Sequence, residues 1–389
     1  MTTVRKPTPG RWTIETSQPV KFSIKNSPGV FSKNNPDVLE FGSKGANARR
    51  LVVIDRNICQ WYLNDVVAYF DANKVESHIV AIDATEDRKD LESLLTILRE
   101  MEQFGVLRRD EPLIAVGGGV LLDIAGMAAG LYRRGVPYVR VPTTLVGLVD
   151  ASVGAKTGIN FENRRNRLGS YYPPLAAYLD RHFLKTLPSL EISSGLGEIL
   201  KMAVIKDHDL FLILEQHGKE LVDTKFDAGE NADEVINRAV QGMKESLETN
   251  LWETDLKRLV DFGHSFSPIV EMRSIHDQGH VALTHGQAVT LDVLFSCVIS
   301  NLRGLMTQAD LFRVVKTAKA MSLPTHHMLF GEPLVLLEAL NDTMKHRNGA
   351  QNLPVPRGIG DPIFVNDLTF DEIKNAADVF KKLNRDLPA

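Results

Sequence analysis

The stretch "EPLIAVGGGVLLDIAGMAAGLYRRG", residues 111–135, decides the fold. It opens with a short apolar run, continues through the glycines 117–119, and ends in a longer apolar segment. This pattern predicts a buried strand, a glycine turn and a helix. Such a unit is typical of a parallel sheet, in which helical connections return the chain to the same end of the sheet.

The flanking sequence repeats this alternation of strands and helices. Apolar runs predict further buried strands at residues 49–58, 76–83 and 137–150. Helical patterns occupy residues 63–75 and 90–106. Residues 11–31 alternate apolar and polar side chains between turn formers, which predicts a pair of strands. Strands that alternate with helices imply a parallel sheet covered on both faces.

The strand pattern fades after about residue 187. Apolar periodicity then predicts helices at residues 193–218, 232–249, 285–304 and 369–384. We therefore expect an α/β protein with a Rossmann-like parallel-sheet domain at residues 1–187 and a mostly α-helical domain at residues 188–389. A cleft between the two domains is the expected place for a ligand.

Composition narrows the class of function. The 389 residues carry a net charge of -4, which argues against nucleic acid or an anionic membrane as partner. No apolar run is long enough to span a membrane. Cys59 and Cys297 are the only cysteines, so no disulfide framework is expected. With no apolar leader at the N-terminus, we expect a cytoplasmic protein.

The glycine turn "VGGGVLLD", residues 116–123, is the first chemical signal. Glycine allows the backbone to approach a phosphate, and the N-terminus of the following helix favours an anion. The pattern is not the dinucleotide fingerprint GxGxxG. A nucleotide site and an ordinary tight turn therefore both stay open.

A polar segment follows the predicted strand at residues 137–150. Residues 142–160 contain Thr143, Thr144, Asp150 and Lys156, and residues 161–174 add a group of arginines and Asn166. Cationic side chains beside glycine suit a phosphate-bearing substrate. A solvated basic loop is the alternative. Nearer the C-terminus, residues 198 and 201 are a glutamate and a lysine on one face of a helix, which predicts either a structural ion pair or a site.

Residues 260–289, "VDFGHSFSPIVEMRSIHDQGHVALTHGQAV", hold four histidines: His264, His276, His280 and His285. Zinc binds histidine and carboxylate ligands, and a catalytic zinc site keeps one position open. His276 and His280 have the spacing of neighbours on a helix. The spacing does not choose between His280 and His285, and a chance cluster of surface histidines is the alternative.

Several blocks resemble the sugar-phosphate cyclases of the dehydroquinate synthase superfamily. They are "GGGVLLDIAG", "NRLG", "FLKTL", "GLGEILK", "DFGHSFSP" and "HGQAV", in this order. The sequence of residues 119–152 is most similar to those of the sedoheptulose 7-phosphate cyclases. The resemblance implies a dehydroquinate synthase-like fold, a catalytic NAD, one divalent metal (zinc or cobalt) and a homodimer.

The resemblance also implies roles for residues. The metal ligands would be Glu198, His264 and His285, because the block "HGQAV" favours His285 over His280. The implied catalytic residues are Asp150, Lys156, Asn166, Lys201, Arg134, Arg165 (where lysine is common) and Lys257. The implied cofactor contacts are Asp55, Glu86, Lys89, Gly118, Gly119, Asp123, Thr143, Thr144, Phe183, Thr186 and Leu187.

The implied reaction converts sedoheptulose 7-phosphate into a C7 cyclitol with release of phosphate. It proceeds through transient oxidation by NAD, elimination, reduction and aldol closure, and 2-epi-5-epi-valiolone is the expected product. Alternative activities are synthesis of 2-epi-valiolone or desmethyl-4-deoxygadusol, dehydroquinate synthase, and a polyol dehydrogenase of the glycerol dehydrogenase type. Asp261 and Pro268 replace an asparagine and a histidine of dehydroquinate synthases. An added aspartate would repel a substrate carboxylate, so a neutral sugar terminus is expected.

Overall fold

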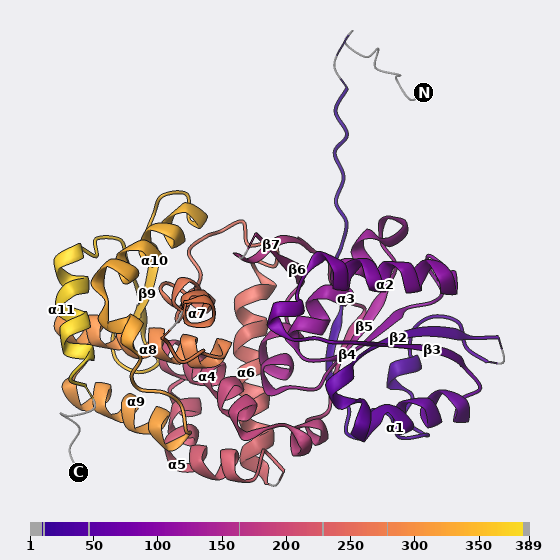
Figure 1. Ribbon diagram of the computed structural model, residues 1–389, viewed down its shortest axis with the longest axis horizontal. Helices are drawn as coiled ribbons and strands as arrows, with labels where there is room; N and C mark the ends of the chain where they lie inside the picture. Colours follow the sequence, from indigo (N-terminus) through magenta and orange to yellow (C-terminus); the bar gives the residue numbers. More distant parts are fainter. Residues whose placement is uncertain are drawn as a thin grey trace, which may run out of the picture.

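The computed structural model describes residue 10 and residues 12–45, 47–162, 164–227, 229–277 and 279–383 (Figure 1). An α/β part, indigo to purple in Figure 1, lies beside a helical part that runs from pink to yellow. The predicted fold class is confirmed. The predicted domain boundary at residues 187/188 falls between the 3₁₀ helix η6 (Arg181–Thr186) and helix α4 (Ser189–Ile205), and it stays a prediction.

A six-stranded sheet forms the α/β part, in the order β1-β8-β5-β4-β2-β3, and all neighbouring strands are parallel. Its strands are β1 (Ser23–Asn26), β2 (Arg49–Asp55), β3 (Glu76–Ile82), β4 (Leu113–Gly117), β5 (Tyr138–Pro142) and β8 (Ala176–Leu179). The strands predicted near residues 49, 76, 113 and 137 are therefore confirmed, but β3 is only partly buried at the sheet edge and the last of them ends at Pro142 rather than residue 150.

Helices cover both faces of this sheet, as Figure 1 shows. They are α1 (Cys59–Ala72), α2 (Leu91–Phe104) and α3 (Gly119–Leu131). Leu51 and Val53 of β2 pack in the core beneath α2 and α3, whereas Val52 and Ile54 pack in the core beneath α1. Alternate side chains of a strand point to opposite faces, so a strand buried on both sides must be apolar throughout.

The strand pair predicted at residues 11–31 is wrong. In this region only β1 is a strand, and its partner is β8, in parallel register. Trp12 and Ile14 are 79% and 93% exposed, so their alternation with polar residues has no apolar surface to pack against. Residue 11 lies outside the described part of the chain.

The second half is helical, as predicted. Besides α4 it contains α5 (His208–Asp223), α6 (Glu230–Glu248), α7 (Ser267–His276), α8 (His285–Leu302), α9 (Gln308–Ala320), α10 (Pro333–His346) and α11 (Phe370–Phe380). The single helix predicted at residues 193–218 is wrong, because Asp207 accepts a hydrogen bond from the Leu210 amide and starts α5 afresh. No helix in the described residues is both long and apolar enough to cross a membrane.

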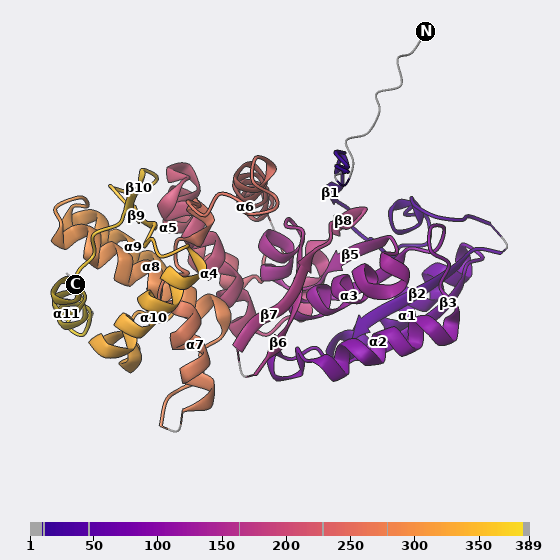
Figure 2. The same ribbon diagram turned by 90° about the horizontal axis from the view of Figure 1, so that it is seen from above.

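Two antiparallel hairpins were not predicted. Strands β9 (Leu353–Pro356) and β10 (Pro362–Val365) form one of them. Strands β6 (Lys156–Phe161) and β7 (Arg164–Tyr171) form the other, in the segment for which a solvated basic loop was an alternative. This β6–β7 hairpin lies between the parallel sheet and the helical part, beside α7 (Figure 2). It therefore brings residues of the first half to the second.

Candidate active site

The carboxyl edge of the sheet contains a topological switch point. From β2 the chain adds β3 on one side and then β4 on the other side, so the order reverses between β2 and β4. Asp55 ends β2, Gly117 ends β4, and Thr143 follows β5. Ligands of open α/β sheets bind at such a crevice. The site residues predicted at these three strand ends therefore share one edge.

The glycine turn at this edge suits a phosphate group. Gly118 caps the N-terminus of α3, and a Cβ on it would lie 2.9 Å from Cγ2 of Thr144. The start of a helix attracts anions, and the missing side chain leaves its backbone amides accessible. The buried hydroxyl of Thr143 has no hydrogen-bond partner among the described residues, which leaves it free for a ligand.

Aromatic side chains extend this edge. Phe183, Thr186 and Leu187 lie in or just after η6, which follows β8. Tyr62 of α1 joins them, because its ring centroid lies 4.8 Å from that of Phe183 and its hydroxyl lies 3.1 Å from Oγ1 of Thr186. Tyr62 was not predicted from the sequence, because no motif in α1 indicates that this side chain contacts η6.

A buried lysine ties the β6–β7 hairpin to the sheet. Nζ of Lys89 donates hydrogen bonds to Oδ2 of Asp123 and Oδ1 of Asn166, both at 2.6 Å. Asn166 has a φ of 51°, and its backbone N–H donates a hydrogen bond to Oδ1 of Asn160. Two predicted cofactor contacts and one predicted catalytic residue are thus in direct contact. Asn160 was missed.

The helical part contributes a cluster that could hold a metal. Glu198, His264 and His285 each offer one ligand atom, and these atoms lie within 4.8 Å of one another. Oε1 of Glu198 is 3.1 Å from Nε2 of His285 and 3.7 Å from Nε2 of His264. Both oxygens of Glu198 are buried without a hydrogen bond from any described residue. Within the described residues, no other such group of three is found.

Close contact between α4 and α8 creates this cluster. Gly197 precedes Glu198, and Gly286 follows His285. A Cβ on Gly286 would lie 1.7 Å from the carbonyl oxygen of Ser194, so the two helix backbones touch at a place where only glycine fits. Helix α8 begins at His285, as predicted.

The charges around Glu198 are strongly coupled. Burial raises the pKa of Glu198, but Nζ of Lys201 lies 2.5 Å from Oε2 and, with the two histidines, holds that pKa well below its usual value. Burial and Lys201 lower the pKa of His264 to about 3. Burial and the charge of Glu198 raise the pKa of Asp150, which places Asp150 beside the cluster. His264 therefore presents a neutral imidazole, the form that binds metals.

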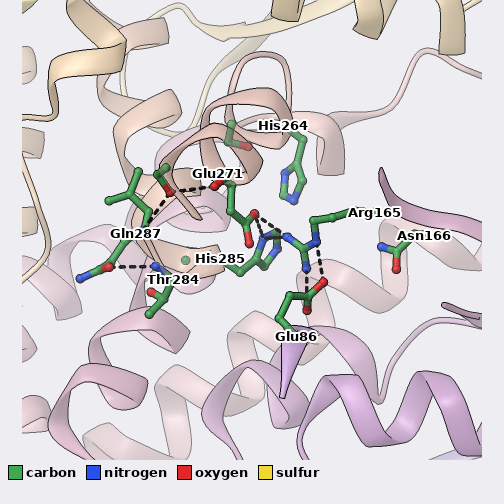
Figure 3. A network of polar contacts seen from close by, with 12 residues as sticks. Glu86, Arg165, Asn166, His264, Glu271, Thr284, His285 and Gln287 are labelled. Atoms are coloured by element: carbon green, nitrogen blue, oxygen red, sulfur yellow. Dashed lines mark hydrogen bonds and ion pairs between the residues drawn. The ribbon is translucent and has the colours of Figure 1, made fainter. Parts of the chain in front are cut away.

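On its other side His285 meets a second carboxylate, as Figure 3 shows. Nδ1 of His285 lies 3.1 Å from Oε2 of Glu271 and 3.0 Å from Nη1 of Arg165. Arg165 also forms ion pairs with Glu271 and Glu86. Burial lowers the pKa of His285, but Glu271 and Glu198 raise it to about 9. Glu271 was not predicted as a site residue.

A chain of alternating charges extends the site toward the C-terminus. Lys156 and Arg258 both form ion pairs with Glu253. Arg258 also binds Asp261, with Nη2 to Oδ1 at 2.6 Å, and the buried Arg347 lies 3.4 Å from Oδ2 of Asp261. Asp261, which was expected to repel a substrate carboxylate, is thus paired with two arginines, and these weaken the repulsion on which that expectation rested. Arg258 and Arg347 were missed.

Two predicted catalytic residues do not join these contacts. The ammonium of Lys257 lies 4.9 Å from the ring centroid of Phe364 in β10, and its neighbour Arg258 enters the site instead. Arg134 follows the C-terminal end of α3, about 20 Å from the glycine turn for a helix of this length. It makes no side-chain hydrogen bond or ion pair with the described residues.

The surplus histidines also lie outside the cluster. His276 ends α7 and is exposed. The ring centroid of His280 lies 6.0 Å from that of His327, whose Nε2 contacts the carbonyl of Val281. Of the two candidates that spacing left open, the structure brings His285, not His280, to Glu198 and His264.

The sheet edge and the facing Glu–His–His cluster define the class of protein. Residues 79–194 match the family model 3-dehydroquinate synthase N-terminal, and residues 195–347 match 3-dehydroquinate synthase C-terminal. The chain belongs to the dehydroquinate synthase family. The resemblance seen in the sequence blocks is confirmed.

Individual relatives refine this placement. A 2-epi-5-epi-valiolone synthase of Streptomyces albus is 45% identical over 96% of this chain and 91% of its own length. A demethyl-4-deoxygadusol synthase of Trichormus variabilis is 32% identical over 96% of this chain and 91% of its own length. The structure of a 2-epi-5-epi-valiolone synthase from Streptomyces hygroscopicus subsp. jinggangensis, with NAD⁺ and Zn²⁺ bound, is 44% identical with a TM-score of 0.90, covering 96% of this chain and 100% of that one.

Proposed function

We propose that the protein is a sedoheptulose 7-phosphate cyclase that releases phosphate and forms 2-epi-5-epi-valiolone. The observation that carries the proposal is the cluster of Glu198, His264 and His285 beside the carboxyl edge of the sheet. The similarity to 2-epi-5-epi-valiolone synthases exceeds that to the demethyl-4-deoxygadusol synthase, which favours this product over the alternatives.

The three clustered side chains would hold one divalent ion, zinc or cobalt. One carboxylate and two imidazoles leave a coordination position open for substrate, as catalytic zinc sites do. The buried carboxylate of Glu198 fits this role, because its Oε1 faces both imidazoles while its Oε2 pairs with Lys201. When bound, NAD accepts and returns a hydride while the metal polarises the substrate oxygens.

The carboxyl edge of the sheet would bind the dinucleotide. Its proposed contacts are Asp55, Glu86, Lys89, Gly118, Gly119, Asp123, Thr143, Thr144, Phe183, Thr186 and Leu187. Asp55 is buried at the end of β2, where a carboxylate can accept from a ribose hydroxyl and repel a 2′-phosphate. We therefore favour NAD over NADP.

Two further residues beside the cluster would orient substrate hydroxyls and move protons. Burial lowers the pKa of Lys201, but Glu198 and Asp150 more than offset this and leave it raised. Lys201 therefore stays cationic and can hold a hydroxyl oxygen. Asp150 lies in a π-helical turn (Gly147–Ala151), a distortion frequent at functional sites, and it would accept a hydrogen bond from the same hydroxyl.

Polar and cationic side chains of the β6–β7 hairpin and its neighbours would bind the phosphate. We assign this role to Lys156 and Asn166, with Arg258 in the place predicted for Lys257. Glu253 pairs with both Lys156 and Arg258, so the substrate phosphate would compete with this carboxylate. A phosphate contact by Arg134 stays a prediction.

Phosphate release by the purified chain with NAD and zinc tests the proposal. Sedoheptulose 7-phosphate should be turned over, NADH should not accumulate, and NMR should identify the product as 2-epi-5-epi-valiolone. A preference for the dehydroquinate synthase substrate, or one NADH formed per product, would contradict it.

We further propose a cytoplasmic homodimer, as expected from the family resemblance. Light scattering of the purified chain should give twice the mass of one chain. The mass of a single chain would refute the dimer and leave the proposed activity untouched.

A further inference from the structure

Glu271 is a buried carboxylate on α7, and its position behind His285 has no role in the reaction described so far. Its side chain is 3% exposed. Oε2 of Glu271 lies 3.1 Å from Nδ1 of His285 (Figure 3). Nε2 of the same ring lies 3.1 Å from Oε1 of Glu198. The two ring nitrogens thus face two different carboxylates, one inside the cluster and one behind it.

Arg165 holds Glu271 in this position. Its Nη1 forms an ion pair with Oε2 of Glu271, and its Nε and Nη2 lie 3.1 and 3.4 Å from the two oxygens of Glu86. The guanidinium is planar and donates through a fixed fork, so pairing with two carboxylates fixes its orientation. Oε2 of Glu271 thus faces two possible donors, Nη1 of Arg165 and Nδ1 of His285.

The same arginine creates a competing arrangement for His285. Nη1 of Arg165 lies 3.0 Å from Nδ1 of His285. Arginine can only donate, so a hydrogen bond to Nδ1 would require the neutral imidazole to carry its proton on Nε2. A protonated Nε2 has no lone pair for a metal. A hydrogen bond from Nδ1 to Glu271 gives the opposite tautomer and leaves the lone pair of Nε2 free.

We propose that Glu271 is the positioning residue of His285: it accepts the Nδ1 proton and selects the tautomer whose Nε2 can bind the metal. This inference rests on the proposed metal site. Carboxylates behind metal-bound histidines typically contribute 10- to 100-fold to metal affinity, because they fix ring orientation and tautomer. Among the described residues, Nδ1 of His264 has only a backbone partner, the carbonyl of Phe262 at 3.2 Å, whereas Nδ1 of His285 has a carboxylate.

The test is metal affinity of the full-length chain, measured for Zn²⁺ and Co²⁺ against a chromophoric chelator. We expect Glu271→Gln to weaken both affinities by about 10- to 100-fold and to change the visible spectrum of the cobalt form. Glu111→Gln is the matched control, because Glu111 is equally buried and paired with Arg49 but lies outside the site. It should bind metal like the wild type.

A double variant separates tautomer selection from a structural role. Glu271→Gln combined with Arg165→Met removes the donor that competes for Nδ1, so it should bind metal more tightly than Glu271→Gln alone. If Glu271→Gln weakened metal binding only by disturbing the structure, the double variant should bind metal still more weakly. Metal affinity equal to or below that of Glu271→Gln would therefore refute the tautomer mechanism.

The two proposals fail in different ways. If the wild-type chain binds neither metal, the proposed metal site fails. If the wild type binds metal and Glu271→Gln binds it equally well, only the role of Glu271 is overturned. Circular dichroism establishes that each variant is folded, and the comparison with Glu111→Gln corrects for loss of a buried glutamate–arginine pair.

Discussion

Replacement of Gly286 by alanine tests whether the close contact of α4 and α8 sets the site. The new Cβ would lie 1.7 Å from the carbonyl oxygen of Ser194 and 2.5 Å from its carbonyl carbon. Carbon–oxygen contacts are normally about 3.3 Å or longer, so the helices must separate locally by about 1.6 Å. Both obstructing atoms belong to the backbone of a buried helix and cannot rotate away.

This displacement falls on the metal cluster. His285 is the residue before Gly286, and Ser194 lies one helical turn before Glu198. Metal–ligand distances tolerate about 0.2 Å, and misplacement of catalytic groups by about 1 Å costs roughly 100-fold in rate. We therefore expect Gly286→Ala to lose about 100-fold or more in zinc affinity and in kcat/KM. Overpacking of this kind costs about 1–3 kcal/mol of folding free energy, so the variant should still fold.

Gly242→Ala is the control for this experiment. Gly242 lies within α6, and a Cβ there would meet only the flexible end of Met202, at 3.1 Å. Alanine is also a better helix former than glycine by about 1 kcal/mol. Zinc titration, thermal unfolding and phosphate release are measured for both variants. Wild-type zinc affinity in Gly286→Ala would refute the idea that backbone contact between α4 and α8 places the ligands.

Three further predictions concern single side chains. His264→Ala should lose bound zinc by elemental analysis and His280→Ala should keep it, and the reverse pattern would overturn the ligand assignment. Arg258→Met should lower kcat/KM by at least about 10-fold, because charged hydrogen bonds contribute about 1.5–3 kcal/mol. Lys257→Met should have little effect. Equal losses in the two variants would contradict the proposal that Arg258, and not Lys257, binds the phosphate. Asp261→Asn should lower the urea-unfolding free energy by about 3–5 kcal/mol, because it leaves the buried Arg347 without its carboxylate, and an unchanged midpoint would show that the pairing adds no stability.

The sheet was predictable because its signals are local. The apolar run and the glycines of residues 113–119 specify strand, turn and helix start within a few residues of one another. The three clustered ligands could be found from the family blocks around them. Residues 11–31 misled the prediction, because alternation shows which side chains could share a face but not whether a partner strand exists. At residue 207 the periodicity continued across a helix break that one aspartate creates.

The missed site residues have a common cause. Glu271, Arg258 and Arg347 each look like an ordinary charged residue in a helix or loop, and only their partners give them a role. The partners of Glu271 and Arg347 are distant in the sequence, and Arg258 gains its role only because its near neighbours Glu253 and Asp261 also face the site. A single sequence contains no signal for such pairs. Arg258 was missed beside the predicted Lys257, because position along the chain does not reveal which of two adjacent side chains points toward other charged groups.

The position of Arg165 has a consequence for the order of events during synthesis. Its partner Glu86 lies 79 residues earlier in the chain, whereas Glu271 and His285 lie 106 and 120 residues later. At about 5–20 residues per second, translation needs about 6–24 s to produce His285 after Arg165. The parallel sheet ends at Leu179 and can form during this interval. The proposed metal site cannot form before His285 is synthesised, so an ion bound there cannot nucleate folding of the first half during translation.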